Sequence, residues 1–107
     1  MKINRIVPFA LALSLFTQGV FALEAMQGAN VNWVGVNRVG EYKIEAEIEK
    51  DGVKKVYYLS LNSDGTMSDF AKTVYSTLLT AKASGSKVHI ASDDGQTYIK
   101  YVYLKDN

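Results

Sequence analysis

Cysteine is absent from this chain of 107 residues, and histidine occurs once. Without cysteine there is no disulfide, no thiolate metal site and no cysteine nucleophile. The single histidine, His89, has no second histidine with which to complete a metal site or a catalytic pair. We therefore expect no metal, no cofactor and no catalytic residue, and a structural or surface role for His89. The protein is not expected to be an enzyme.

Neither sign of charge is in large excess, because the chain has 12 basic and 11 acidic residues. Nucleic-acid-binding domains usually carry a strong basic excess, so no nucleic-acid partner is expected. The hydrophobic fraction of 48% is too high for a disordered chain. A chain of this length forms one small domain with a modest core. Since it has no disulfide, subunit association is one way to stabilise it.

A long hydrophobic run is also missing. Residues 6–16 are uncharged and mostly apolar, whereas about twenty such residues are needed to span a bilayer. The run follows Lys2 and Arg5 and precedes small residues at Ala22, which is the layout of a secretory signal peptide. We expect residues 1–22 to be this signal and 23–107 to be a single mature domain, periplasmic or secreted, without a membrane span.

The sequence after Ala22 is typical of strands. Alternation of apolar and charged residues is clearest over 42–49, which predicts a half-buried strand. Further strands are predicted over 31–39, 53–61, 87–92 and 97–104. Asp51-Gly52 predicts a type I′ hairpin turn. Residues 23–30 show no periodicity and are expected to be a lead-in.

Apolar residues then recur at three- and four-residue spacing, which predicts an amphipathic helix over 68–83. Its apolar stripe consists of Met67, Phe70, Ala71, Val74, Leu78 and Ala81. Thr66 or Ser68 can cap its first amide groups, and Ser84-Gly85 ends it.

Three strands, one helix and two strands predict a mainly β domain with one helix. This β-β-β-α-β-β order is that of the five-stranded oligonucleotide/oligosaccharide-binding (OB) fold, a small closed barrel in which we expect the helix to plug one end. A ferredoxin-like fold needs a second helix, and a sandwich needs more strands.

Residues 78–90, LLTAKASGSKVHI, resemble the helix-to-strand passage of small exported bacterial proteins with this fold. Among these are the pentameric toxin B subunits of the subtilase-cytotoxin and pertussis-like branch, which the chain matches in element order over 33–104. The resemblance implies an exported OB-fold domain, a homo-oligomeric ring of five subunits and binding to cell-surface glycans. This chain departs from the pattern because it lacks a cysteine pair, and no sugar-contacting residue of a toxin maps onto a specific position.

Tyrosine is the dominant aromatic residue of the predicted mature domain, and its ring with a polar tip suits sugar or protein surfaces. The candidate ligand contacts are Tyr57, Tyr58, Tyr98, Tyr101 and Tyr103. Adjacent Tyr57 and Tyr58 must point to opposite faces of a strand, so one of them is available to the core. Tyr101 and Tyr103 are expected to share a face with Ile99.

Other conspicuous residues have simpler interpretations. Trp33 is expected to pack in the core or at the barrel end. Glu45, Glu47 and Glu49 form a solvated strand face rather than a cation site. The Asp93-Asp94-Gly95 segment and the Asn62-Ser63-Asp64 segment are turns.

Two hypotheses of function follow. In the first, the protein is an exported non-catalytic binding module that self-associates and recognises a glycan or a protein surface. In the alternative, it is a small periplasmic or secreted structural or accessory protein without a ligand of its own.

Overall fold

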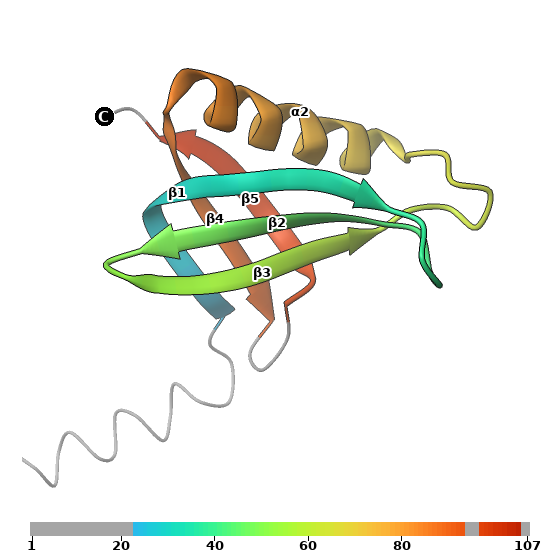
Figure 1. Cartoon of the computed structure of the whole chain (residues 1–107), viewed down its shortest axis with the longest axis horizontal. Helices are drawn as coiled ribbons and strands as arrows, with labels where there is room; N and C mark the ends of the chain where they lie inside the picture. Colours follow the sequence, from blue (N-terminus) through green and yellow to red (C-terminus); the bar gives the residue numbers. More distant parts are fainter. Residues whose placement is uncertain (1–22, 94–96, 106–107) are drawn as a thin grey trace, which may run out of the picture.

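The structure is a computed structural model that describes residues 23–93 and 97–105. The predicted signal peptide, and Asp94 and Gly95 of the predicted turn, lie outside these residues. The described elements are β1 (Leu23–Asn37), β2 (Lys43–Lys50), β3 (Val53–Ser60), α2 (Asp69–Ser84), β4 (Lys87–Asp93) and β5 (Ile99–Lys105). The prediction of a mainly β protein with five strands and one helix, in this order, is confirmed (Figure 1).

Strand β1 is longer than predicted and belongs to both halves of the sheet. Its first part, expected to be a lead-in, pairs with β4, and its second part pairs with β2. A bulge at Gly28, where φ is 70°, lies near the end of the first part, two residues before pairing with β2 begins at Asn30. An inserted residue bends a strand and increases its twist. Figure 1 shows β1 curving from the β4 side to the β2 side.

The sheet is open rather than the closed barrel that was predicted. Its strand order is β3-β2-β1-β4-β5, and the paired strands are antiparallel. The two edges of the sheet approach each other at one parallel bridge, between Tyr58 of β3 and Tyr98, the residue before β5. There the Tyr58 amide donates to the Thr97 carbonyl at 2.9 Å. Among the described residues this bridge is the only backbone pairing between the two edges, so no continuous ladder closes the sheet.

Local turn chemistry agrees with the sequence. Asp51 and Gly52 both have positive φ, at 54° and 82°, as a type I′ turn requires. Helix α2 starts after Ser68, whose side chain accepts a hydrogen bond from the Ala71 amide, and ends at Gly85 in the left-handed conformation. Both predicted ends of the helix are therefore confirmed to within one residue.

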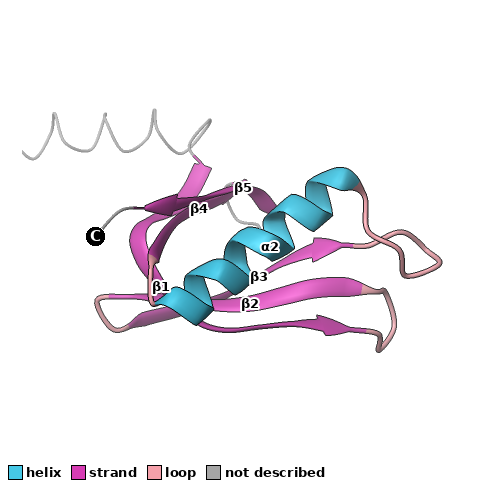
Figure 2. Cartoon of the chain, turned by 90° about the horizontal axis from the view of Figure 1, so that it is seen from above, coloured by secondary structure: helices cyan, strands magenta, loops and turns pink. Residues whose placement is uncertain are grey.

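One core lies between α2 and the inner face of the bent sheet, as Figure 2 shows from above. The helix buries Ala71, Val74, Leu78 and Ala81, four of the six predicted apolar positions. Phe70 is instead 49% exposed, and Met67 packs against the core from the segment before the helix. The strands contribute Ala29, Val31, Ile44, Ala46, Ile48, Tyr57, Val88, Ile90 and Ile99. No helix in the described part of the chain is long and apolar enough to cross a membrane.

Candidate functional site

The most distinctive surface is the outer face of β1, β2 and β3, which points away from the core. The alternation on β2 buries Ile44, Ala46 and Ile48 and turns the glutamates between them outward. Cross-strand register then sets their neighbours, since Trp33 pairs with Glu47 and Gly35 pairs with Glu45. Trp33, Glu45, Glu47, Tyr58 and Tyr98 are named here the aromatic–glutamate face.

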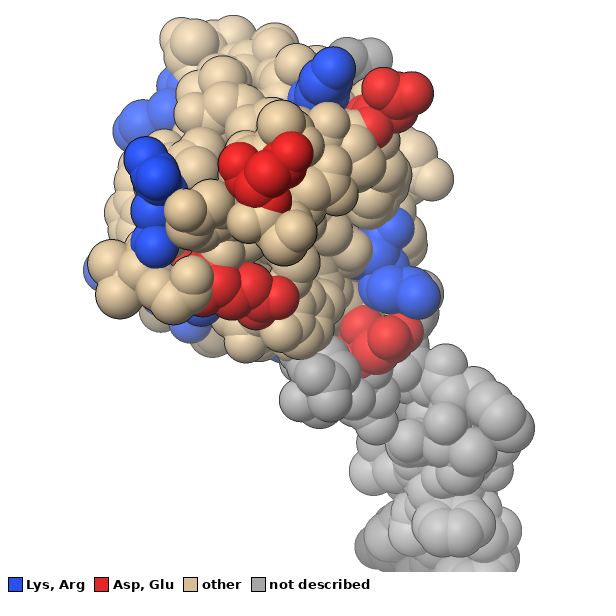
Figure 3. All heavy atoms as spheres, turned by 90° about the vertical axis from the view of Figure 1, so that its right-hand side faces the viewer, with Lys and Arg blue, Asp and Glu red and all other residues tan. Residues whose placement is uncertain are grey.

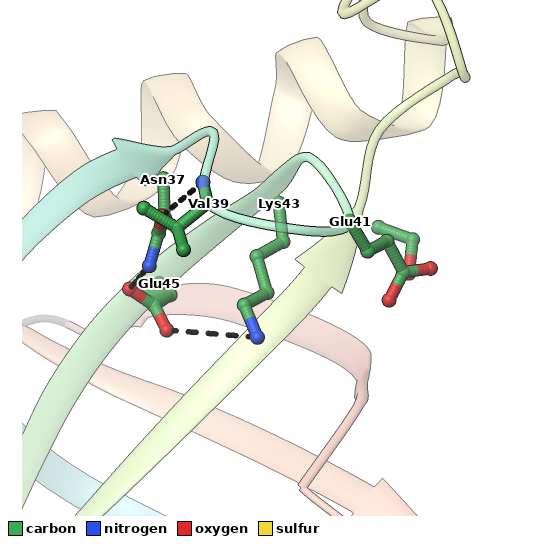
Figure 4. A network of polar contacts seen from close by, with 6 residues as sticks. Asn37, Val39, Glu41, Lys43 and Glu45 are labelled. Carbon is green, nitrogen blue, oxygen red and sulfur yellow. Dashed lines mark hydrogen bonds and ion pairs between the residues drawn. The ribbon is translucent and has the colours of Figure 1, made fainter.

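A polar network fixes the position of Glu45. The Asn37 side-chain amide donates to Glu45 Oε1 at 3.1 Å, and Lys43 Nζ lies 4.0 Å from Glu45 Oε2. Asn37 is itself held, because its Oδ1 accepts from the Val39 amide at 2.7 Å. Figure 4 shows this chain of contacts from the end of β1 across to β2. Glu45 therefore presents a carboxylate of fixed orientation at the surface.

The other two outward glutamates are held by one residue. Asn32 Nδ2 lies 3.0 Å from Glu47 Oε1 and 2.8 Å from Glu49 Oε1. Asn32 is the extra residue of a bulge in β1, between Val31 and Trp33. A shared amide donor offsets the mutual repulsion of two carboxylates on one strand face. Each carboxylate keeps further lone pairs that can accept hydrogen bonds from a ligand hydroxyl.

Trp33 was expected to pack in the core or at the barrel end, but it lies on this surface with 42% of its area exposed. The bulge at Asn32 shifts the phase of the strand, so Trp33 lies opposite the outward-facing Glu47. Two residues further along β1, Gly35 leaves the surface open, since a Cβ added there would meet no atom within 4 Å. The indole ring thus stands beside an open stretch of strand next to Glu45.

Two of the predicted tyrosines meet at the far side of the same face. The rings of Tyr58 and Tyr98 lie 4.7 Å apart in a T-shaped arrangement. Lys43 Nζ lies 4.9 Å from the centre of the Tyr58 ring and so links this pair to the glutamate network. Such aromatic and cation–π contacts restrict the rings to defined orientations.

The other predicted tyrosines do not join this face. Tyr57 is fully buried opposite Ala46 and belongs to the core, as the alternation with Tyr58 requires. Tyr101 and Tyr103 were wrongly expected to share a face with Ile99. A bulge at Lys100 reverses the phase of β5, so that Ile99 is buried, whereas Tyr103 is 60% exposed. The ring centres of Tyr101 and Tyr103 lie 5.1 Å apart, on the strand that pairs with β4.

The remaining polar candidates have structural partners. His89 Nδ1 accepts a hydrogen bond from the Gly28 amide at 3.1 Å, and Asp93 lies 3.8 Å from Lys100 Nζ. Within 23–93 and 97–105, no group of three histidine, cysteine, aspartate or glutamate side chains could hold a metal ion.

The arrangement on the aromatic–glutamate face suits a polyhydroxylated ligand. An exposed aromatic ring can cover the apolar C–H face of a sugar, while carboxylates accept its hydroxyl groups. Trp33 and Gly35 were not among the predicted contacts; the alternation on 42–49 was the available signal for the glutamates.

No protein-family model, curated protein or solved structure matches this chain.

Proposed function

We propose that the protein is an exported, non-catalytic binding module that recognises an oligosaccharide on the aromatic–glutamate face. The observation that carries the proposal is the exposed Trp33 ring beside open strand surface at Gly35, next to the fixed carboxylate of Glu45. A rigid array of this kind loses little entropy when it binds.

We further propose that the domain is a variant of the OB fold. In that fold, the face of the second and third strands binds oligonucleotides or oligosaccharides. The element order, the bent first strand shared by two half-sheets and the parallel bridge between Tyr58 and Tyr98 support this assignment. An acidic outer face favours hydroxyl groups over phosphates, so the oligosaccharide is preferred to the oligonucleotide.

The substitution Gly35→Val tests the site without disturbing the core. Gly35 does not have a positive φ, and its added Cβ has open space, so valine should keep the fold and raise strand stability by up to about 1 kcal/mol. Its branched side chain would cover the surface beside Trp33. On a glycan array we expect the unsubstituted protein, purified from the full chain, to bind at least one oligosaccharide. Gly35→Val should lower the affinity for it at least about tenfold, a difference of about 1.4 kcal/mol.

Gln27→Val is the matched control, because it adds valine to an exposed position of the same strand on the other half-sheet. Its glycan binding should equal that of the unsubstituted protein. Equal binding by Gly35→Val would remove the proposed site, and a protein that binds no glycan would favour the accessory role. Light scattering tests self-association separately: a pentamer supports toxin-like assembly, and a strict monomer contradicts it.

A further inference from the structure

A second surface feature lies at the end of the molecule where β1 meets β2 and where β3 leads into α2. Two loops, 38–42 and 61–68, border a hollow of about 220 Å³. The hollow is lined by Val36, Arg38, Tyr42, Leu61, Asp64 and Gly65. Figure 3 views this end of the molecule and shows basic and acidic side chains scattered over a mostly uncharged surface. We call this feature the Arg38–Asp64 hollow.

The Arg38 guanidinium is held in place at the hollow. Its Nη2 atom donates to the Tyr42 hydroxyl at 3.3 Å, and its Cζ lies 5.1 Å from the centre of the Tyr42 ring. Neither ion pair found among the described residues involves Arg38. A guanidinium has five donors in a planar fork that fits a carboxylate, so most of these donors remain for a ligand.

Asp64 supplies the opposite charge at the same hollow. Its Oδ1 accepts from the Thr66 hydroxyl at 2.6 Å and from the Thr66 amide at 3.0 Å. These bonds, with the hydroxyl bond the larger cause, lower the pKa of the Asp64 carboxyl from its ordinary value, so it is ionised at neutral pH. Both bonds use Oδ1, and Oδ2 can accept a hydrogen bond from a ligand.

We propose that the Arg38–Asp64 hollow binds a small hydroxylated carboxylic acid, of which a uronic acid is the simplest sugar example. The ligand carboxylate pairs with Arg38, a hydroxyl donates to Asp64, and ring carbons lie against Val36 and Leu61. Pockets for drug-sized ligands measure about 300–1,000 Å³, so this smaller hollow suits a single ring. The negative charge of Asp64 disfavours a phosphate dianion.

This site is separate from the aromatic–glutamate face. Val36 pairs with Ile44 in the inward-facing register of β1, whereas Gly35 pairs with the outward-facing Glu45. The proposal therefore does not depend on oligosaccharide binding beside Trp33, and each site has its own test.

The test is an NMR titration of the isotope-labelled protein, purified from the full chain, with glucuronate and with glucose. The two probes share a ring and differ at one carbon, which carries the carboxylate in glucuronate. We expect saturable shifts of the Arg38 side-chain and Leu61 methyl signals with glucuronate, with a Kd of about 1 mM for a ligand this small. Glucose should produce no saturable shift at these signals. An equal response to both sugars, or no response to glucuronate, would overturn the proposal.

Three further arms separate the contributions. Arg38→Gln should weaken glucuronate binding at least about tenfold, as loss of a charge-assisted pair implies. Lys72→Gln removes an exposed positive charge on α2, outside the hollow, and should leave the Kd unchanged. N-Acetylalanine, which has a carboxylate without ring hydroxyls, should bind more weakly. Equal binding of N-acetylalanine and glucuronate would contradict the role of Asp64, and unchanged binding by Arg38→Gln would contradict the site.

Discussion

Gly65 shows how a single residue shapes the loop end of the molecule. Its φ is 86°, and an added Cβ would lie 2.9 Å from Cδ2 of the Tyr42 ring. The Gly65 amide donates to the Asn62 carbonyl at 2.8 Å, which keeps the loop tight. Glycine is needed here for two reasons, because the backbone is left-handed and because the Tyr42 ring packs against it. The same contact positions Tyr42 beneath Arg38.

The substitution Gly65→Ala is expected to destabilise the fold by more than backbone strain alone. A non-glycine residue in the left-handed region costs about 1–2 kcal/mol, and displacement of the Tyr42 ring adds to this. Gly40→Ala is the matched control, since Gly40 also has positive φ, at 73°, but nothing lies within 4 Å of its added Cβ. Urea unfolding measures both losses. Equal losses in the two variants would show that the contact with Tyr42 has no energetic role.

At the scale of the element, the bend of β1 decides how the sheet is assembled. The bulge at Gly28 interrupts the regular hydrogen-bond ladder between β1 and β4. The Gly28 amide instead donates a hydrogen bond to Nδ1 of His89 on β4. The Lys105 side chain lies over the same glycine, about 3.6 Å from an added Cβ. These contacts stabilise the point where β1 leaves β4 and begins to pair with β2.

The substitution His89→Ala should therefore loosen this bend. Loss of the acceptor is expected to lower the free energy of unfolding by about 0.5–1.5 kcal/mol. Hydrogen exchange should also show faster exchange of the Gly28 amide. In His89→Asn, the side-chain oxygen can take the place of Nδ1, so this variant should recover much of the loss. If Asn and Ala destabilise the protein equally, the imidazole stabilises β1 through packing rather than through this hydrogen bond.

Strand alternation and turn chemistry were sufficient to predict β2, its hairpin to β3, and the ends of α2. They were insufficient wherever a bulge inserts one residue, because a shift of one residue turns every later side chain to the opposite face. The bulge at Lys100 turns Tyr101 and Tyr103 to the face opposite to the predicted one, and the bulge at Asn32 does the same to Trp33. The first part of β1 was missed because Gly28 interrupts its pattern.

The candidate site was predicted in part for the same reason. Adjacent Tyr57 and Tyr58 had to face opposite sides, and the structure puts Tyr57 in the core and Tyr58 beside Tyr98. The pairing of Tyr58 with Tyr98 depends on a contact between the two edges of the sheet. The two residues are far apart in the chain, so no local sequence pattern predicts this contact. Arg38 and Asp64 come from two separate loops, so no local sequence pattern indicates that they line the same hollow.

For the whole molecule, stability depends on one small core that joins the two half-sheets. The second part of β1, β2 and β3 form one half, and the first part of β1, β4 and β5 form the other. Helix α2 contributes to the core that both halves share, and the edges of the halves meet at the bridge between Tyr58 and Tyr98. Loss of packing under the helix should therefore affect both halves together.

Adjacent leucines on α2 provide the test. Leu78 is fully buried in the core, while Leu79 is 43% exposed. Leu78→Ala should lower the free energy of unfolding by about 2–5 kcal/mol, because it removes apolar contacts and leaves a cavity. That is a large share of the roughly 5–15 kcal/mol typical of a domain, whereas Leu79→Ala should cost less than about 1 kcal/mol. Urea unfolding followed by the fluorescence of Trp33 reports on the first half, and hydrogen exchange of the β4 amides reports on the second. In Leu78→Ala, both measurements should show the same loss in the free energy of unfolding. If Leu78→Ala released β4 and β5 while the Trp33 transition stayed unchanged, the two half-sheets would be independent units, and the shared core would not be what holds them together.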